Sequence, residues 1–203
     1  ALIFGIFLSI ISVFSLYYFT NLLSSFLLFF TISFYLFIYT IWLKRKTSQN
    51  IVIGGAAGAL PPVIGWTIAT NSLSLEPFAF FLIIFIWTPS HFWALSLYKA
   101  NDYKKAKIPM LPITNGIENT KKNIFIYSLL MLPVIMFPYL IGFSGKTFLV
   151  LSLALTFYYN YICYQLYSYK KNKFEIKRAQ QIFSYSILYL FLVFVLFLID
   201  KII

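Results

Sequence analysis

Seven long apolar stretches constrain what this chain can fold into. They cover approximately residues 1–19, 22–42, 51–70, 77–97, 124–143, 147–167 and 181–199. Each approaches the roughly 20 residues that an α-helix needs to cross a bilayer. Because 61% of the residues are hydrophobic and only 10% are charged, part of the chain must face lipid. The sequence predicts an all-α, polytopic transmembrane helix bundle that forms a single domain over residues 1–203.

The 16 lysines and arginines are unevenly distributed among the loops. Three lie in 43–50, six in 98–123 and five in 168–180, and alternation of the spans puts these loops on one side of the membrane. The positive-inside rule predicts that they face the cytoplasm of a bacterial cell, with the protein in its inner membrane, or the matrix if the membrane is the mitochondrial inner one. Because the cations cluster between spans and not along one helix face, we expect a lipid bilayer and no nucleic acid as partner.

The stretch 51–70 is unlike the others because it is rich in small residues. Gly54 and Gly58 form a GxxxG pair, a spacing that lets helices approach closely in lipid. The dipeptide Pro61-Pro62 is expected to kink or break the helix. Close packing without chemistry is the simpler interpretation, although a broken helix at membrane depth can also line a cavity.

His91, the one histidine of the chain, lies near the end of the fourth apolar stretch. Ionisable residues within a span are costly and usually face the interior of the bundle. This imidazole could ligate haem iron, move a proton or bind a polar substrate group. The structural alternative is a neutral, hydrogen-bonded core histidine.

Asp102 is the only acidic residue among the lysines that directly follow this span. If the helix continues, Asp102 lies about 16–17 Å beyond His91 on the same face. A carboxylate among lysines suits a magnesium–diphosphate group, because Mg²⁺ prefers oxygen ligands and cations neutralise phosphate. Lys44 and Arg45 could face the same opening. The alternative is a solvated Asp102 paired with Lys105, with the lysines serving as helix-end anchors.

Three segments together resemble signatures of the protohaem IX farnesyltransferases, a branch of the UbiA-like intramembrane prenyltransferases. They begin at Tyr39 (YTIWLKRKTSQN, followed by the glycine- and proline-rich stretch), at Trp87 (WTPSHFWAL) and at Asp102 (DYKKAKIPMLP), in the order and spacing of that family. The resemblance implies a nine-helix bundle with a central cavity, of which the seven stretches match the last seven. It also implies prenyl transfer that depends on Mg²⁺ held by two Asp-containing motifs.

The resemblance further implies the substrates and the roles of single residues. A farnesyl group would pass from farnesyl diphosphate to a vinyl group of haem b and give haem O. Asp102 would bind Mg²⁺ and, together with Lys44 and Arg45 near the diphosphate, form the catalytic set. The residues expected to bind haem or cofactor are His91, Trp87, Tyr98 and Asn50. A further expected partner is haem A synthase or the terminal oxidase assembly machinery.

Two departures from the family pattern qualify this prediction. The first Asp-rich motif of the family lies between its second and third spans, yet residues 1–75 contain no acid. We therefore expect that the first two spans and this motif are missing, and that the chain alone is inactive. The second departure is Lys107, which stands where the family commonly has glycine.

Two other functions remain open from the residues alone. One is a UbiA-like prenyltransferase with an aromatic quinone-precursor acceptor. The other is a membrane protein that binds or transports haem without catalysis.

Overall fold

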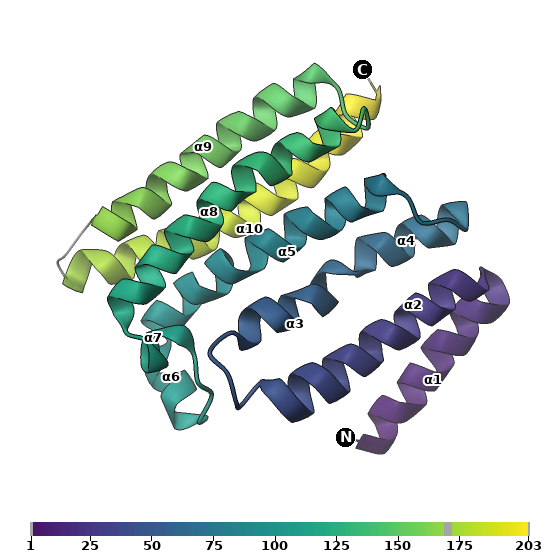
Figure 1. Cartoon of the computed structure of the whole chain (residues 1–203), viewed down its shortest axis with the longest axis horizontal. Helices are drawn as coiled ribbons and strands as arrows, with labels where there is room; N and C mark the ends of the chain where they lie inside the picture. Colours follow the sequence, from purple (N-terminus) through teal and green to yellow (C-terminus); the bar gives the residue numbers. More distant parts are fainter. Residues whose placement is uncertain (1, 169–171, 203) are drawn as a thin grey trace.

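The computed structural model describes residues 2–168 and 172–202, and within these ranges the regular elements are all helices (Figure 1). They are α1 (Leu2–Phe19), α2 (Leu22–Ser33), the π-helix η1 (Phe34–Leu43), α3 (Asn50–Ala59), α4 (Pro61–Thr70), α5 (Leu75–Tyr98), α6 (Ala100–Lys105), α7 (Leu111–Thr114), α8 (Ile117–Leu140), α9 (Lys146–Ser168) and α10 (Asn172–Ile202). The predicted all-α fold is confirmed.

Six helical segments of the described chain are long and apolar enough to cross a membrane. They match six of the seven predicted stretches: Leu22–Leu43, Asn50–Thr70, Leu75–Tyr98, Ile117–Leu140, Lys146–Ser168 and Glu175–Ile202. The remaining stretch corresponds to α1, which is apolar but shorter in its described part, Ile3–Phe19. The predicted number of seven spans is therefore approximate.

The connections that carry most cations lie at one end of the bundle, at lower left in Figure 1. This basic end comprises the turn 44–49, the segment 99–116 and the facing ends of α9 and α10. Lys170 and Lys171 of the third basic loop lie outside the described residues. The connections 20–21, 71–74 and 141–145 lie at the opposite end, so the chain alternates as the charge pattern predicts.

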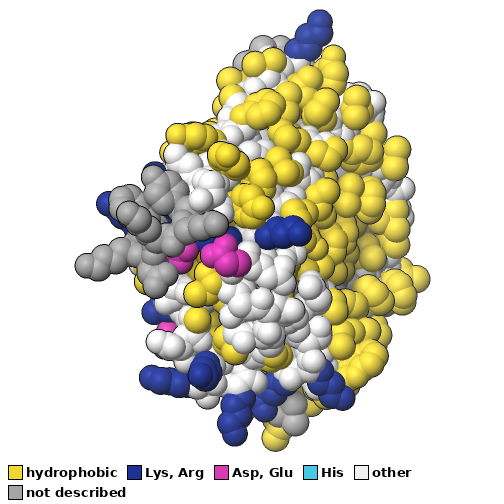
Figure 2. Space-filling model, turned by 60° about the vertical axis from the view of Figure 1, so that its left-hand side comes forward, with side chains coloured by type: hydrophobic (Ala, Val, Ile, Leu, Met, Phe, Trp, Pro, Cys, Tyr) yellow, Lys and Arg dark blue, Asp and Glu magenta, His cyan; other side chains and the backbone are white. Residues whose placement is uncertain are grey.

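A broad apolar belt covers the surface between the two ends. Figure 2 shows hydrophobic side chains over much of this face, with most of the visible lysines and arginines gathered below them. Large side chains such as Phe19, Leu140 and Phe191 are mostly exposed. Because such a belt would be unfavourable in water, it is the surface expected to contact lipid acyl chains.

Helix α5 lies at the centre of the bundle and packs against α3, α4, α8 and α10. Its side chains Ile83, Trp93 and Ala94 are fully buried in a core that α8, α9 and α10 complete. On the other side, α1 packs mainly against α2. Helix α5 therefore joins a tightly packed half of the bundle to a more open half.

Helix α8 begins earlier than hydropathy predicts. The predicted span starts at 124, whereas α8 starts at Ile117 and so includes Lys121. The ammonium group of Lys121 is fully buried, at 2.9 Å from Glu118 Oε1 and 2.8 Å from Glu175 Oε1 on α10. Two carboxylates compensate the buried charge, so a residue that hydropathy assigns to a loop lies within the helix bundle.

The segment between α5 and α8 holds two short helices and departs from the predicted geometry. Helix α5 ends at Tyr98, and Lys99 has φ −107° and ψ 17°, so the assumption of one helix from His91 to Asp102 is wrong. The separation calculated from that assumption does not apply. Lys107 adopts φ +55°, in the left-handed region that favours glycine. That conformation explains why glycine would suit this position better.

The predicted break in the third span is confirmed. Helix α3 ends at Ala59 and α4 begins at Pro61. Prolines at 61 and 62 offer no N–H to the carbonyls of Ala57 and Gly58, and Leu60 N–H donates to Ala57 O instead. The α-helical bonding is thereby interrupted at membrane depth.

The glycines of α3 divide between two roles. A Cβ built on Gly55 would lie 3.0 Å from Thr88 Cγ2 of α5, and one on Gly54 would lie 2.6 Å from the Tyr39 ring of η1. A Cβ on Gly58 would meet no atom within 4 Å. Close packing is therefore confirmed for Gly54 and Gly55, whereas Gly58 faces open space.

The π-helix η1 was not predicted. Its widened turn is seen in the bond from Lys44 N–H to Tyr39 O (2.7 Å), which reaches the fifth preceding residue. Hydropathy cannot separate a π-helix from an α-helix, because it depends on which side chains are present and not on how the backbone is hydrogen-bonded. Such segments are often found at functional sites.

The contrast between Gly55 and Gly58 gives a matched stability test. At either position, replacing glycine by alanine adds one methyl group and favours the helix by a similar amount, roughly 1 kcal/mol. At 55 the methyl group presses on Thr88, which a 2.7 Å bond from Oγ1 to Ile84 O holds in place. Overpacking of this kind costs about 1–3 kcal/mol. We expect a lower thermal unfolding midpoint in detergent for Gly55→Ala than for Gly58→Ala, and equal midpoints would contradict the close α3–α5 contact.

Candidate functional site

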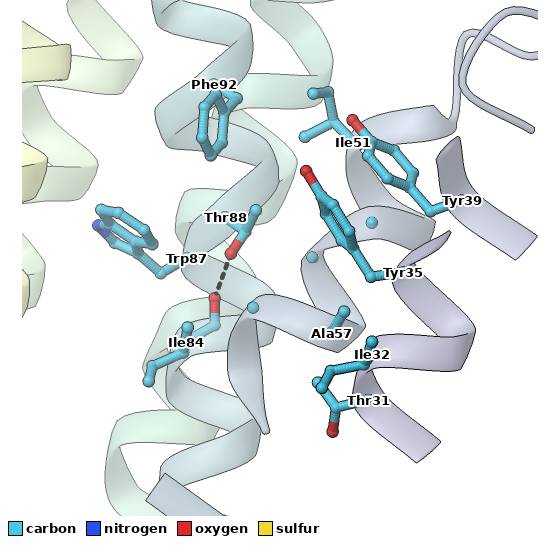
Figure 3. Close-up of a pocket in the computed structure, with 13 residues that line it drawn as sticks. Thr31, Ile32, Tyr35, Tyr39, Ile51, Ala57, Ile84, Trp87, Thr88 and Phe92 are labelled. Carbon is cyan, nitrogen blue, oxygen red and sulfur yellow. Dashed lines mark hydrogen bonds between the residues drawn. The ribbon is translucent and has the colours of Figure 1, made fainter. Parts of the chain in front are cut away.

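A cavity of about 560 Å³ lies between the helix formed by α2 and η1, the broken third span and α5 (Figure 3). Its volume is within the usual range for small-molecule sites, roughly 300–1,000 Å³. The lining is mostly apolar and comprises Thr31, Ile32, Tyr35, Tyr39, Ile51, Gly54, Gly55, Ala57, Gly58, Ile84, Trp87, Thr88 and Phe92. An apolar chain is therefore the kind of group that this cavity suits best.

Aromatic side chains form two opposite walls of the cavity. Tyr35 and Tyr39 extend from η1 toward α5, with ring centroids 5.1 Å apart (Figure 3). Trp87 and Phe92 line the cavity from α5. Gly58 leaves room on α3, since no side chain projects there. Aromatic faces on both sides can stabilise a cation in the space between them.

Tyr39 connects the cavity to the basic end. Its ring lines the cavity, and Lys44 Nζ lies 5.7 Å from the ring centroid. Lys44 is half-buried, whereas Arg45 is exposed. The predicted cations Lys44 and Arg45 therefore lie where the η1 end of the cavity meets the basic turn.

Asn50 fixes this basic turn from within. Its side chain is 1% exposed, and Nδ2 donates to Thr47 O at 2.9 Å and to Lys44 O at 3.3 Å. Its Oδ1 is buried without a hydrogen-bond partner among the described residues. The residue predicted to bind cofactor thus has an observed role in holding the backbone that carries Lys44.

His91 lies behind the cavity wall and not in it. Its ring is stacked between Trp87, at a centroid distance of 4.2 Å, and Phe183 of α10, at 4.6 Å. Its Nδ1 lies 2.6 Å from Ser186 Oγ, also on α10. The side chain is 6% exposed, and Trp87 separates it from the cavity lining.

Trp87 and Tyr98 meet the same part of α10. Trp87 Nε1 donates to Ser186 O at 2.8 Å, and the Tyr98 ring lies 6.1 Å from Phe183 in an edge-to-face arrangement. The structure therefore brings the predicted residues Trp87, His91 and Tyr98 together around Phe183 and Ser186. It leaves Asn50 in a separate place, at the basic turn.

Asp102 lies on α6 at the basic end with 65% of its side chain exposed. Its carboxylate is 3.6 Å from Lys99 Nζ, so its ion-pair partner is Lys99 and not the Lys105 considered from the sequence. Beside it, partial burial raises the pKa of Tyr103, so this phenol stays protonated and can donate a hydrogen bond. Asp102 is thus available to solvent and to a ligand.

The described residues do not form a complete magnesium site. No group of three or more Asp, Glu, His or Cys side chains lies close enough in the described ranges to hold a metal. Mg²⁺ can bind through one or two carboxylates when substrate phosphates supply further oxygens. Asp102 fits one such ligand.

Sequence reasoning missed several residues of this site. Tyr35 and Tyr39 were overlooked as cavity walls because tyrosine is frequent in the chain and the π-helical turn gives no sequence signal. Ser186 and Phe183 lie almost a hundred residues from His91, so only tertiary packing shows that they contact it.

A second cavity of about 870 Å³ lies between α1 and the helix formed by α2 and η1. Ile32 and Tyr35 line both cavities. The second cavity is lined by none of the residues predicted to act in chemistry or binding. The first cavity is therefore the candidate site.

The chain was compared with known families, proteins and structures. The model of the UbiA prenyltransferase family matches residues 1–188. No solved structure matches the chain.

Curated relatives match nearly the whole chain. A "Protoheme IX farnesyltransferase" from Pelagibacter ubique is 73% identical over 202 residues, which cover 100% of this chain and 67% of that protein. Proteins of the same name from Parvibaculum lavamentivorans (47% identical over 201 residues, 99% of this chain and 63% of the relative) and Rickettsia akari (49% over 198 residues, 97% and 63%) are also similar. The chain thus spans about two thirds of the length of these relatives. It belongs to the UbiA prenyltransferase family.

Proposed function

We propose that the protein transfers a farnesyl group from farnesyl diphosphate to a vinyl group of haem b and so forms haem O. The observation that carries this proposal is the 73% identity, over the entire chain, to a relative named protoheme IX farnesyltransferase. The aromatic cavity that meets a basic turn agrees with a substrate that has an apolar chain and an anionic head.

In this proposal the diphosphate binds at the basic end and the farnesyl chain enters the cavity. Lys44 and Arg45 neutralise the diphosphate, since cations beside phosphate form strong charge-assisted hydrogen bonds. Tyr39 supports this orientation because it contacts both the cavity and Lys44. Asn50 keeps the turn in place through its bonds to the carbonyls of Thr47 and Lys44.

Asp102 would supply one carboxylate to a Mg²⁺ ion that, when bound, draws negative charge from the leaving diphosphate. The described residues include no cluster of three or more potential metal ligands, and the chain spans about two thirds of its relatives. We therefore propose that the first Asp-rich motif of the family completes the site, and that the 203-residue chain is inactive alone.

The chemistry requires the cavity to control a reactive cation. The bond between farnesyl C1 and the diphosphate oxygen breaks, and the oxygen keeps the electron pair. The vinyl π electrons of haem b then form the new carbon–carbon bond to C1. Water adds to the resulting cation and loses a proton, which gives the hydroxyethylfarnesyl group. Tyr35, Tyr39 and Phe92 would exclude bulk water and stabilise the allylic cation through their rings.

The haem is proposed to bind against the cluster that joins α5 and α10. His91, Trp87 and Tyr98 lie together there, and Trp87 is both a lining residue of the cavity and the indole stacked on His91. This arrangement would place a haem vinyl group near the farnesyl C1.

We further propose a bacterial inner membrane location with the basic end in the cytoplasm, and contact with haem A synthase or the oxidase assembly machinery.

Product analysis tests the proposed reaction. Membranes with the intact, full-length protein would receive farnesyl diphosphate, Mg²⁺ and either haem b or a hydroxybenzoate or naphthoate acceptor. We expect haem O from haem b and no prenylated aromatic acid. If only the aromatic acid were prenylated, the acceptor would be a quinone precursor and not haem b. If the protein bound haem but released no diphosphate, it would be a non-catalytic haem-binding protein.

Replacing Asp102 tests its role at the diphosphate. Asp102→Asn in the full-length protein should lower kcat about 100-fold or more, as loss of a group that stabilises developing charge typically does. Glu76→Gln is the matched control. Glu76 is exposed at the start of α5, whereas Asp102 follows the other end of this helix. Near-normal haem O formation by Asp102→Asn would exclude Asp102 from the site.

Substituting two neighbouring cations of the basic turn distinguishes a role in diphosphate binding from a role in membrane anchoring. Arg45→Gln should raise the KM for farnesyl diphosphate about tenfold, the expected effect of losing a charge-assisted hydrogen bond worth roughly 1.5–3 kcal/mol. Lys46→Gln, one residue further in the same exposed turn, should leave this KM within about twofold. If both substitutions changed this KM equally, neither cation would bind the diphosphate specifically, and both would serve only to orient the protein in the membrane.

A further inference from the structure

Ser186 of α10 has a hydroxyl group with two partners and one proton to donate. Ser186 Oγ lies 2.7 Å from Phe183 O and 2.6 Å from His91 Nδ1. A backbone carbonyl can only accept a hydrogen bond, so the Ser186 proton satisfies the bond to Phe183. Both hydrogen bonds are then made together only if His91 Nδ1–H donates to Ser186 Oγ.

We infer that Ser186 is a positioning residue that holds His91 in the Nδ1–H tautomer and leaves Nε2 unprotonated as the ligand for the haem iron. A neutral imidazole carries one proton, so a donor at Nδ1 makes Nε2 a free electron-pair donor. A ring nitrogen in this form is the atom that ligates haem iron in proteins. The haem part of this inference rests on the proposed function, whereas the tautomer does not.

Aromatic side chains hold the His91 ring in place. Trp87 and Phe183 cover the two faces, and Phe92 lies edge-on to the ring at a centroid distance of 5.0 Å. Trp87 is itself fixed by the bond from Nε1 to Ser186 O. One residue of α10 thus orients both the imidazole and the indole stacked on it.

The two ring nitrogens of His91 differ in their surroundings. Nδ1 contacts Ser186 Oγ, whereas Nε2 has no hydrogen-bond partner among the described residues. Nε2 is not one of the fully buried polar atoms that lack a partner, so it reaches the surface of the described chain although the residue is just 6% exposed. A histidine that ligates a metal characteristically hydrogen-bonds to the protein through one ring nitrogen and binds the metal through the other. The arrangement around His91 has this form.

The single histidine of the chain makes the tautomer directly measurable. His91 is the only histidine in the 203 residues, so ¹⁵N-histidine labelling, with purification through a tag without histidine, gives the signals of one residue. We expect a protonated-type shift for Nδ1 and an unprotonated-type shift for Nε2 in the protein without haem. The opposite assignment, or an equal mixture of the two forms, would overturn the inference.

Three substitutions separate positioning from folding. Ser186→Ala removes the hydroxyl but keeps the backbone carbonyl that accepts from Trp87, so the tautomer preference should be lost while the fold persists. Ser186→Thr retains a hydroxyl and should restore it. Ser152→Ala is the control, since Ser152 is fully buried on α9 and its hydroxyl donates only to Leu149 O at 3.2 Å. An unchanged ¹⁵N spectrum in a folded Ser186→Ala protein would contradict the role of Ser186.

Binding of haem b and of iron-free protoporphyrin IX to the full-length protein tests the ligand. Loss of a hydrogen-bond partner behind a ligating histidine typically lowers metal affinity about 10- to 100-fold. We expect Ser186→Ala and His91→Ala to weaken haem binding by this factor, with a changed Soret band, and to leave protoporphyrin binding nearly unaltered. Equal loss for both porphyrins would overturn iron ligation. The NMR result stands independently, because it requires neither haem nor turnover.

Discussion

The fold depends on satisfying polar groups inside a bundle that lipid surrounds. The central helix α5 carries serine, threonine, histidine and tryptophan side chains, and three of them (Trp87, Ser90 and His91) bond to neighbouring helices, whereas the buried Trp93 Nε1 has no hydrogen-bond partner among the described residues. Ser90 Oγ lies 2.8 Å from Tyr159 OH on α9, while Trp87 and His91 bond to Ser186 on α10. Because hydrocarbon offers no alternative partners, these bonds select one rotation of α5 against its neighbours. The orientation of the candidate site follows from that selection.

The cavity exists because the opposite half of the bundle is interrupted twice. The proline pair divides the third span, and η1 widens the second span to a π-helical turn. Gly54 and Gly55 then allow α3 to approach both neighbours, whereas Gly58 leaves the space between them unfilled. A continuous pair of α-helices with larger side chains would close this space. The irregular half of the bundle thus provides the binding volume, and the regular half provides a rigid support.

Hydropathy and charge were sufficient for the architecture but not for its local geometry. Apolar length located the spans, and the uneven cations gave the alternation of the loops. Lys121 shows the limit of this approach, because its burial depends on Glu175, which lies 54 residues away. The interruption at Lys99 was also missed, since no proline or glycine marks it. Of the residues that the motifs singled out, Trp87 lines the cavity, whereas His91 and Asn50 lie outside its lining. The contacts of Ser186 and Tyr35 arise only from tertiary packing.

The electrostatic contrast between the two ends of the site argues for a division of labour. At the basic end, Asp102 is exposed and its observed partner, Lys99, lies on an adjacent turn at 3.6 Å. Ion pairs of this kind contribute about 0–1 kcal/mol, so a bound metal ion would displace Lys99 from Asp102 at little cost. His91 is instead held by two aromatic faces and a 2.6 Å contact to Ser186. In the proposed reaction, a headgroup site that binds and releases diphosphate would benefit from such adaptable charges. An imidazole that presents one nitrogen to a rigid macrocycle would require the opposite, a position fixed before the ligand arrives.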